Sequence, residues 1–246
     1  MSAVEVERLS KVFGGLRAVD EASLAVAEGE RRVLIGPNGA GKTTLFNCIA
    51  GTLQPTAGRV RLLGRDISAL AEHRRSALGM GRTFQISNVF TDLTVRDNLL
   101  LAILGTDARK WNMWRPLSRF APERAQAQES LACVGLVGRA DALVRHLSYG
   151  ERRQLELALA LNVNPKVLLL DEPCAGLSPR ERQRFAQLIA ALPRAITLIM
   201  IEHDIDIALA LADRVTVLHQ GRIIFDGTPA AVRSDQQVRE VYLGRV

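Results

Sequence analysis

The hydrophobic positions of the chain follow two patterns, which predict two kinds of β-strand. Short and nearly continuous apolar runs occupy residues 32–36, 167–170, 197–201 and 214–218. Such runs are typical of strands that are covered on both faces of a sheet. Residues 4–9 and 23–27 instead alternate apolar and polar side chains, and residues 59–63 do so in part. This alternation predicts half-exposed antiparallel strands.

Helical periodicity fills the segments between these runs. We expect helices over residues 42–50, 151–161, 180–192 and 205–212. The third of them has Ser178 as a suitable N-cap and Pro179 at the first helical position. Strands and helices that alternate in this way predict a mainly parallel α/β sheet.

Between about Leu93 and Leu143 the strand signals vanish and helical ones dominate, with Thr94 and Pro122 as expected helix starts. We therefore expect a helical lobe inserted into the α/β core. Within it, residues 109–120 concentrate both tryptophans with several basic residues. This mixture fits a surface that faces a partner or a membrane, and it fits an aromatic core beside a solvated loop equally well.

Composition sets the class of protein without naming a function. The 246 residues are 48% hydrophobic and 24% charged, as in an ordinary globular protein. No apolar run approaches the roughly 18 residues of a membrane-spanning helix, and the N-terminus carries acids where a signal peptide has an apolar core. We expect a soluble chain that stays in the cytoplasm. Cys48, Cys133 and Cys174 have no paired or metal-like spacing, and we expect them to be small buried hydrophobes.

The formal charge of +6 changes this picture little. The basic residues are spread along the chain and are nearly all arginine. Such a distribution favours an arginine-rich solvated surface over a binding surface for nucleic acid or lipid headgroups.

A glycine-rich segment, Gly36-Pro37-Asn38-Gly39-Ala40-Gly41-Lys42-Thr43, gives the strongest chemical signal. It matches G-x-x-x-x-G-K-[ST] between an apolar strand and a helix, which is the context that a phosphate-binding loop requires. Its glycines let several backbone N–H groups turn inward, where the N-terminus of the following helix adds partial positive charge. Lys42 then reaches the β- and γ-phosphates, and the Thr43 hydroxyl is suited to bind Mg²⁺.

Two adjacent carboxylates, Asp171 and Glu172, end the apolar run at residues 167–170. Charge at the end of a buried strand is costly unless a metal or a partner compensates it. Because successive strand residues point to opposite sides, the two acids are suited to different tasks. Asp171 fits a Mg²⁺ site, and Glu172 fits a base that polarises an attacking water.

Ser148 stands three residues before Glu151 at the start of a strongly periodic helix. Taken alone, this arrangement is a plain capping box. The order of all the motifs, however, resembles the ATP-binding cassette of an ABC transporter. The motifs are the glycine loop, Thr83-Phe84-Gln85, Leu147-Ser148-Tyr149-Gly150-Glu151, Leu168 to Glu172, and Ile201-Glu202-His203-Asp204.

The resemblance implies a role for each matching residue. Phe13 would stack on the adenine, and Gln85 would sense Mg²⁺ and the attacking water. His203 would hold the γ-phosphate and that water. Ser148 and Gly150 would contact the γ-phosphate held by a partner subunit, because cassettes of this family pair head to tail around two ATP molecules.

These implications complete the set of candidate site residues. The candidate catalytic residues are Lys42, Gln85, Glu172 and His203, the candidate Mg²⁺ ligands are Thr43, Gln85 and Asp171, and the candidate ATP contacts are Phe13, Gly36, Pro37, Asn38, Gly39, Ala40, Gly41, Lys42, Thr43, Thr44, Ser148 and Gly150.

Three residues depart from the commonest pattern of the family. Tyr149 replaces the first glycine of the signature, Glu151 replaces its glutamine, and Ser178 stands where aspartate is usual. Because Ser148 and Gly150 remain, we expect the γ-phosphate contact to persist.

The resemblance also implies the fold and its boundaries. We expect a P-loop α/β core of the ABC type with a mainly parallel sheet, an N-terminal antiparallel β strip and an inserted helical subdomain. Residues 1–246 would form one ATP-binding domain, with the core at 1–85 and 144–246 and the helical subdomain at about 86–143.

A finer similarity points to a substrate class. The segments that carry it are Phe13 to Val19, Gly81 to Gln85, Ala175 to Pro179 and Val238 to Gly244. They resemble the ATPase subunits of importers for branched-chain amino acids and related small polar or aromatic solutes. The resemblance implies a homo- or heterodimer of ATPase subunits, bound to a transmembrane permease at the cytoplasmic face of the membrane and served by a solute-binding protein. A soluble cassette acting on nucleic acid or ribosomes, and the ATPase of an exporter, are the alternatives.

Overall fold

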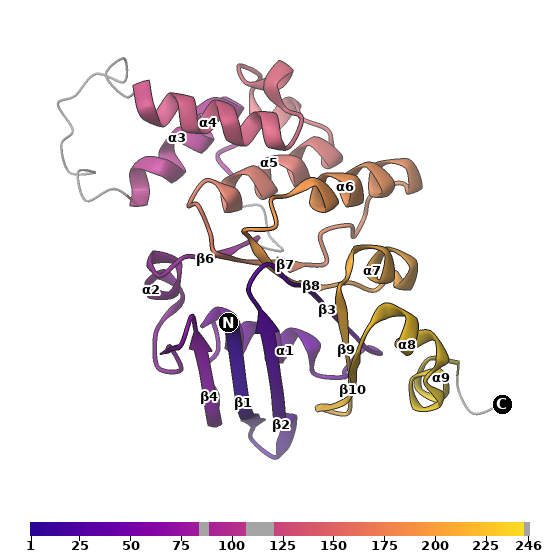
Figure 1. Cartoon of the computed structure of the whole chain (residues 1–246). Helices are drawn as coiled ribbons and strands as arrows, with labels where there is room; N and C mark the ends of the chain where they lie inside the picture. The colour runs from indigo at the N-terminus through magenta and orange to yellow at the C-terminus, as the bar shows by residue number, and fades with distance from the viewer. Residues whose placement is uncertain (84–88, 107–120, 244–246) are drawn as a thin grey trace. The chain divides into compact units, whose positions relative to one another are not determined.

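The computed structural model describes residues 1–83, 89–106 and 121–243 of the chain (Figure 1). Two compact units divide these residues. The first contains the described residues of Met1–Met80, Lys166–Pro173 and Pro193–Val246, and the second contains those of Gly81–Pro165 and Cys174–Leu192. The proposed helical subdomain at about 86–143 falls within the second unit, which extends further along the chain.

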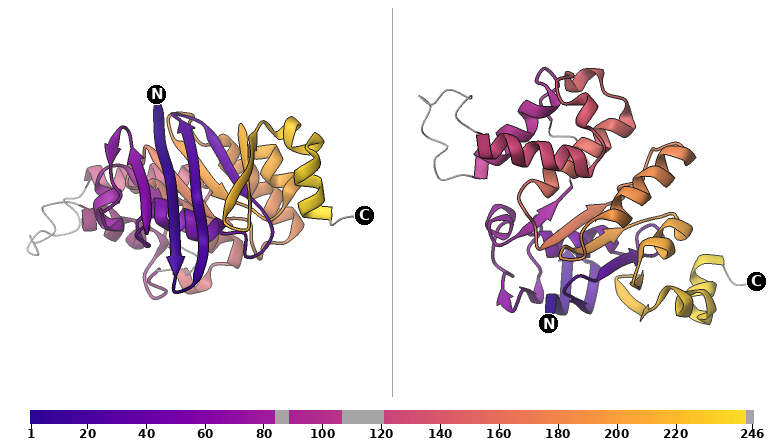
Figure 2. Two further views of the ribbon diagram at one scale, coloured as in Figure 1. Left: turned by 90° about the horizontal axis from the view of Figure 1, so that it is seen from below. Right: turned by 45° about the horizontal axis from the view of Figure 1, so that its top comes forward.

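An antiparallel sheet opens the first unit. Its strands are β1 (Ser2–Phe13), β2 (Leu16–Ala27), β4 (Ala57–Leu62) and β5 (Arg65–Asp66), in the order β2-β1-β4-β5. β1 and β2 run side by side (Figure 2, left), and Val4 pairs with Val26 on β2 and with Leu62 on β4. The predicted half-exposed antiparallel strands are therefore confirmed.

A second sheet has the strand order β10-β9-β3-β8-β7-β6. Its strands are β3 (Arg31–Ile35), β6 (Met80–Arg82), β7 (Val167–Asp171), β8 (Thr197–Ile201), β9 (Arg214–His219) and β10 (Arg222–Gly227). β3 pairs in parallel with both β8 and β9, and every residue of β3, β7 and β8 is buried. This confirms the predicted parallel core, whereas the short β6 and the edge strand β10 were not predicted.

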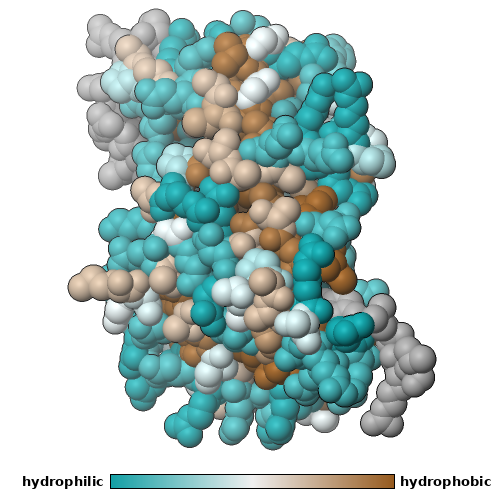
Figure 3. Space-filling view, turned by 45° about the vertical axis from the view of Figure 1, so that its right-hand side comes forward, coloured by the Kyte–Doolittle hydropathy of each residue, from teal (hydrophilic) through white to brown (hydrophobic). Residues whose placement is uncertain are grey.

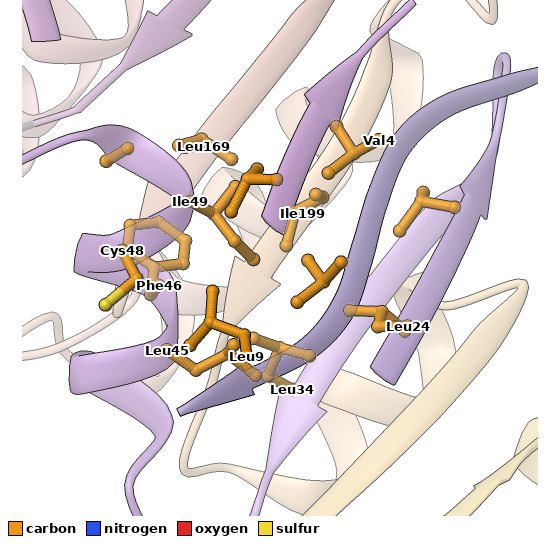
Figure 4. Packing of buried hydrophobic residues seen from close by; sticks show 14 of the residues in the cluster. Val4, Leu9, Leu24, Leu34, Leu45, Phe46, Cys48, Ile49, Leu169 and Ile199 are labelled. Carbon is orange, nitrogen blue, oxygen red and sulfur yellow. The ribbon is translucent and has the colours of Figure 1, made fainter. Parts of the chain in front are cut away.

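Helix α1 (Lys42–Ala50) lies between the two sheets of the first unit. It contacts β1 and β2 on one side and β8 on the other. Leu45, Phe46 and Ile49 are fully buried there, against Leu9 of β1 and Ile199 of β8 (Figure 4). Burial of a large apolar side chain contributes about 1.5–3 kcal/mol, so this packing fixes the helix that follows the glycine loop.

Four further short helices belong to the described part of the first unit. They are α2 (Glu72–Ala77), α7 (Ile205–Leu211), α8 (Pro229–Ser234) and α9 (Gln236–Leu243). The predicted helices at 42–50 and 205–212 are confirmed as α1 and α7. Asp204 caps α7 by accepting hydrogen bonds from the backbone N–H groups of Asp206 and Ile207.

The second unit is mainly helical. Its helices are α3 (Val95–Thr106), α4 (Ala121–Cys133), α5 (Tyr149–Leu161) and α6 (Pro179–Ala191), with short 3₁₀ turns η3 (Val137–Arg139) and η4 (Val144–His146). α3, α4 and α5 contact one another, and Leu99, Leu131 and Leu155 are fully buried among them. The helix starts expected at Thr94 and Pro122 lie within one residue of the observed ones.

One expectation about burial was wrong. Cys48 and Cys174 are buried as predicted, but Cys133, the last residue of α4, is exposed. Arg32 and Arg75 are fully buried and so do not belong to the expected arginine-rich solvated surface. Arg75 is accommodated because its guanidinium donates to the carbonyl oxygens of Cys48 and Ile49 at the end of α1, both at 2.7 Å.

Polar side chains cover most of the face seen in Figure 3, with smaller apolar patches between them. Within the described part of the chain, no helix is both long and apolar enough to cross a lipid bilayer.

Candidate functional site

The glycine loop joins the buried strand β3 to α1. Gly36, Gly39 and Gly41 have φ values of +151°, +78° and +99°, in the region that favours glycine. Gly41 is also the N-cap of α1, and no side chain caps this helix end. The N–H groups of the first turn of a helix without a side-chain cap are available to bind an anion at the helix start.

Backbone from three other segments braces this loop. A Cβ on Gly36 would lie 2.2 Å from the carbonyl oxygen of Leu218, and one on Gly41 would lie 2.4 Å from that of Ala18. The N–H of Gly221, in the β9–β10 turn, donates to the Ala40 carbonyl at 2.9 Å. Sequence reasoning did not identify these bracing residues, since the contacts join positions far apart in the chain and involve only backbone atoms.

Lys42 is buried at the start of α1. Its ammonium donates to the carbonyl oxygens of Gly36 at 2.7 Å and Pro37 at 2.9 Å. Burial lowers the pKa of Lys42, and the nearby Glu172 carboxylate opposes this shift. The charge of Lys42 is thus held at the mouth of the loop and within electrostatic reach of Glu172. Thr43 is exposed next to it, and Thr44 is half-buried.

The two adjacent carboxylates lie at the end of β7. Asp171 is the last residue of the strand and is buried, while Glu172 follows it with φ of +47°, which is unusual for a residue other than glycine. The Glu172 N–H donates to the Ile201 carbonyl of β8 at 3.1 Å. Strained backbone of this kind is frequent at functional sites.

His203 follows β8, which is the neighbouring parallel strand. Its Nε2 lies 2.7 Å from Oε1 of Glu172, and both side chains are partly exposed. A carboxylate can only accept a hydrogen bond, so the imidazole donates to it through Nε2. The structure therefore brings together two residues, 31 positions apart in sequence, that were both predicted as catalytic.

Phe13 ends β1 and is 45% exposed. The ammonium of Lys11 lies 5.0 Å from the centroid of its ring and donates to the Gln54 carbonyl at 2.9 Å. One side of the ring is thus held by a cation, while the exposed part is accessible to a stacking partner. This is compatible with the predicted adenine contact.

Ser148 and Gly150 belong to the second unit, at the start of α5. The Ser148 hydroxyl accepts from the Glu151 N–H at 3.2 Å, and the Glu151 carboxylate accepts from the Ser148 N–H at 2.8 Å. This capping box is the plain structural interpretation of the segment, and the structure confirms it. Arg139 pairs with Glu151 at 2.7 Å and lowers the pKa of that carboxyl.

Two predicted features lie outside the described residues. They are Gln85 and the tryptophan-rich segment at 109–120.

Comparison with known proteins decides the family. A family model described as ABC transporter matches residues 19–175. The chain belongs to the ABC transporter family. A second model, described as branched-chain amino acid ATP-binding cassette transporter, matches residues 222–246 of this cassette.

Relatives and solved structures resemble the cassette over nearly its full length. It is 39% identical to the high-affinity branched-chain amino acid transport ATP-binding protein BraF of Pseudomonas aeruginosa, covering 98% of this chain and 97% of that one. It is 36% identical to the lipopolysaccharide export system ATP-binding protein LptB of Haemophilus influenzae, covering 99% and 98%.

Among solved structures, the ADP conformation of an ATP-binding cassette of an ABC transporter superposes with a TM-score of 0.89 at 32% identity, over 100% of both chains. A dimeric post-hydrolysis cassette bound to ADP and phosphate superposes with a TM-score of 0.76 at 25% identity, over 92% of this chain and 98% of that one. These likenesses confirm the predicted fold class.

Proposed function

We propose that this cassette is the ATPase subunit of an importer for branched-chain amino acids or related small polar or aromatic solutes. The cassette is an ATP-hydrolysing enzyme of the ABC type. The substrate class rests on the identity with BraF and on the match of residues 222–246 to the branched-chain amino acid cassette model. The hydrogen bond between Glu172 and His203, with the Lys42 ammonium within electrostatic reach of Glu172, is the observation that carries the catalytic assignment.

The residues of the loop fit the phosphates of ATP. A Cβ on Gly36 or Gly41 would collide with the backbone that braces the loop, so only glycine allows the loop this conformation. Glycine-rich loops of this kind can turn their N–H groups toward phosphate. Lys42 already directs its ammonium to two carbonyl oxygens of the loop, which are acceptors like phosphate oxygens. We propose that the backbone of residues 36–41 and the side chains of Lys42, Thr43 and Thr44 hold the phosphates, with Phe13 against the adenine.

The donor set also fits Mg²⁺, which prefers oxygen ligands and binds together with substrate phosphates. Asp171 presents a carboxylate at the end of β7, and Thr43 presents an exposed hydroxyl. We propose these two residues and Gln85 as the Mg²⁺ ligands. When bound, the ion would neutralise the charge that develops on the β- and γ-phosphates during hydrolysis.

Glu172 and His203 would orient the attacking water. The Glu172 carboxylate can accept a proton from water, and His203 holds that carboxylate in place through Nε2. His203 is partly exposed, so it can also turn to donate to a γ-phosphate oxygen. We propose Glu172 as the general base and His203 as the residue that aligns the base with the γ-phosphate.

Ser148 and Gly150 would complete the site of a partner subunit. The N-terminus of α5 carries N–H groups and partial positive charge, which suit a phosphate. A solved relative at 25% identity is a dimer with ADP and phosphate. We propose that two cassettes, identical or different, enclose two ATP molecules, and that each site takes its loop from one chain and Ser148 and Gly150 from the other.

A transmembrane permease is the expected partner of this cassette dimer. We propose that the cassette binds transmembrane permease subunits at the cytoplasmic face of the membrane and that a solute-binding protein supplies the permease. Export is a second candidate, because LptB is 36% identical over nearly the whole chain. Import is favoured by the higher identity with BraF and by the C-terminal family match.

Two experiments test this proposal. Glu172→Gln should lower the ATP turnover of the purified protein by about 10²-fold or more while ATP still binds. Glu28→Gln, at an exposed carboxylate between β2 and β3, is the control and should leave turnover unchanged. Turnover at the wild-type rate in Glu172→Gln would refute the assignment of the base.

In cells, deletion of the gene should abolish uptake of labelled leucine, with the wild-type gene restoring it and the Glu172→Gln gene failing to do so. Normal leucine uptake combined with lipopolysaccharide retained in the inner membrane would favour the export function instead.

A further inference from the structure

Tyr149 links the start of α5 to the loop at residues 174–178. Its hydroxyl donates to the carbonyl oxygen of Ala175 at 3.2 Å. The hydroxyl oxygen of Tyr149 also accepts from Nε of Arg153 at 3.1 Å and from Nη2 of Arg153 at 2.8 Å. The hydroxyl therefore uses its donor and both of its acceptor positions, although the tyrosine is 50% exposed. A glycine here, as is usual in the family, could make none of these contacts.

Arg153 lies one turn along α5 and is firmly held. It pairs with Glu156 at 3.0 Å, and both of these side chains are largely buried. Burial alone would lower the pKa of Arg153, but the Glu156 carboxylate and the Tyr149 hydroxyl together raise it. The guanidinium also lies over the tyrosine ring, 5.3 Å from its centroid. Arg153 thus fixes both the position of the ring and the direction of its hydroxyl.

The loop approaches the tyrosine closely at Gly176. This glycine has φ of +75°, and a Cβ on it would lie 3.0–3.2 Å from Oη, Cε1 and Cζ of Tyr149. At the far end of the loop, a Cβ on Gly150 would lie 2.9 Å from Oε1 of Glu181. The other carboxylate oxygen of Glu181, Oε2, accepts from the N–H of Ser178. The loop and the start of α5 therefore meet at two points, both within the second unit.

From these contacts we propose that Tyr149 is a positioning residue for ATP hydrolysis. Arg153 fixes the Tyr149 hydroxyl, and that hydroxyl donates to the Ala175 carbonyl. This linkage, here called the clasp, makes the Ser148–Gly150 segment and the loop at 174–178 move as one body. The loop directly follows Glu172 and Pro173 in the chain. A movement of the proposed catalytic carboxylate would therefore be passed through the loop to Ser148 and Gly150, which we propose to contact the ATP of the partner subunit. The kinetic part of this proposal rests on the proposed function of Ser148 and Gly150.

Tyr149→Phe tests the clasp, because it removes the hydroxyl and keeps the ring over Gly176. Arg153→Lys is the second variant, since lysine keeps the charge facing Glu156 but lacks the planar fork. Arg139→Gln is the matched control. It removes an exposed arginine that pairs with Glu151 on the same turn, and Arg139 makes no described contact with the loop at 174–178.

Two measurements are made on the full-length protein: amide hydrogen exchange of the 174–178 segment, and ATP turnover. Tyr149→Phe and Arg153→Lys should speed the exchange of that segment. Each should lower kcat by roughly three- to tenfold, as expected for the loss of one or two hydrogen bonds, with KM for ATP within about twofold of the wild type. The double variant should lose no more than the worse single variant, because the two residues act as a unit. Arg139→Gln should behave as the wild type.

Wild-type exchange and kcat in Tyr149→Phe would overturn the proposal. So would an equal loss in Arg139→Gln, since any loosening of the turn would then suffice. An additive loss in the double variant would also overturn it. Failure of the wild-type protein to hydrolyse ATP would refute the proposed function, and the exchange measurement would still decide whether the clasp exists.

Discussion

Gly41→Ala should damage the phosphate loop, because the added methyl group would collide with backbone that braces the loop. The added Cβ would lie 2.4 Å from the Ala18 carbonyl oxygen and 3.3 Å from the Gly221 Cα. Side-chain Cβ atoms do not come within 3.0 Å of such atoms, so the loop or β2 has to move by at least 3.0 − 2.4 = 0.6 Å. Both neighbours are backbone. Gly221 is also hydrogen-bonded to Ala40 and Asp20, which leaves little room to yield.

The expected loss of stability in Gly41→Ala has two causes. A residue with a Cβ in the left-handed region costs about 1 kcal/mol more than glycine, and forced overpacking adds about 1–3 kcal/mol. We therefore expect Gly41→Ala to lower the free energy of unfolding by about 2–4 kcal/mol and to weaken ATP binding at least about tenfold.

Gly64→Ala is the control that measures the cost of the left-handed backbone conformation without a collision. Gly64 has φ of +78°, but a Cβ there would meet nothing within 4 Å. Its loss of stability should be about 1 kcal/mol, with ATP binding unchanged. Urea unfolding and titration with a fluorescent ATP analogue measure both quantities. If Gly41→Ala lost no more stability than Gly64→Ala and bound ATP normally, the bracing of the loop by β2 and the β9–β10 turn would be refuted.

Three further predictions concern the fold. Arg75→Met should lower the free energy of unfolding by about 3 kcal/mol in urea unfolding, because buried carbonyl oxygens at the end of α1 lose their donor; a loss below about 1 kcal/mol would contradict this. Burial alone would raise the pKa of Asp213, but hydrogen bonds from Arg194 and from the Arg31 N–H lower it below 3.8. Its stabilisation should be complete above that pH and be lost as the pH falls further, so Asp213→Asn should show a shallower acid loss of stability than the wild type; parallel curves would count against this. A thiol reagent should label Cys133 in the native protein and Cys48 only after unfolding, since Cys133 is exposed and burial raises the pKa of Cys48 to about 11; simultaneous labelling in a peptide map would contradict the burial pattern.

Local physics explains what could be predicted from the sequence. The helix at 42–50 was predicted with its observed bounds, because a glycine at its start and buried apolar positions along it act over one or two turns. At the start of α6, Ser178 and Pro179 were predicted as the observed N-cap and first helical residue, whereas the predicted end at residue 192 lies one residue beyond the observed end at Ala191. Strand β8 was predicted with its observed bounds, since a continuous apolar run describes a strand buried on both faces.

Long-range contacts explain what could not be predicted. The edge strand β10 is only partly buried, so it has no strong apolar run to reveal it. The two buried arginines are stabilised by partners far along the chain: Arg32 contacts Asp226, and Arg75 contacts the end of α1. No local pattern identifies such partners.

The same distinction applies to the candidate site, where local motifs identify residues and the fold sets their geometry. The loop, Asp171 and Glu172 were identified from motifs that are local in sequence, and the resemblance to a family added His203. Their mutual geometry, such as the 2.7 Å between His203 and Glu172, follows from the pairing of β7 with β8. In the sequence Tyr149 is only a departure from the usual glycine. Its contact with Arg153, one turn along the helix, is local, whereas its contact with Ala175, 26 residues away, depends on the fold.

Each ATP site should combine the loop of one chain with Ser148 and Gly150 of another. A mixture of two inactive variants can test this arrangement. Lys42→Ala disables the loop, and Ser148→Arg blocks the segment that serves the partner, so each variant alone should show no ATP turnover. In a mixed dimer one site retains an intact loop and an intact Ser148. Mixing equal amounts should therefore restore turnover, up to about a quarter of the wild-type rate for random pairing in a two-fold dimer. Turnover in the mixture no higher than in the separate variants would contradict a site shared between chains.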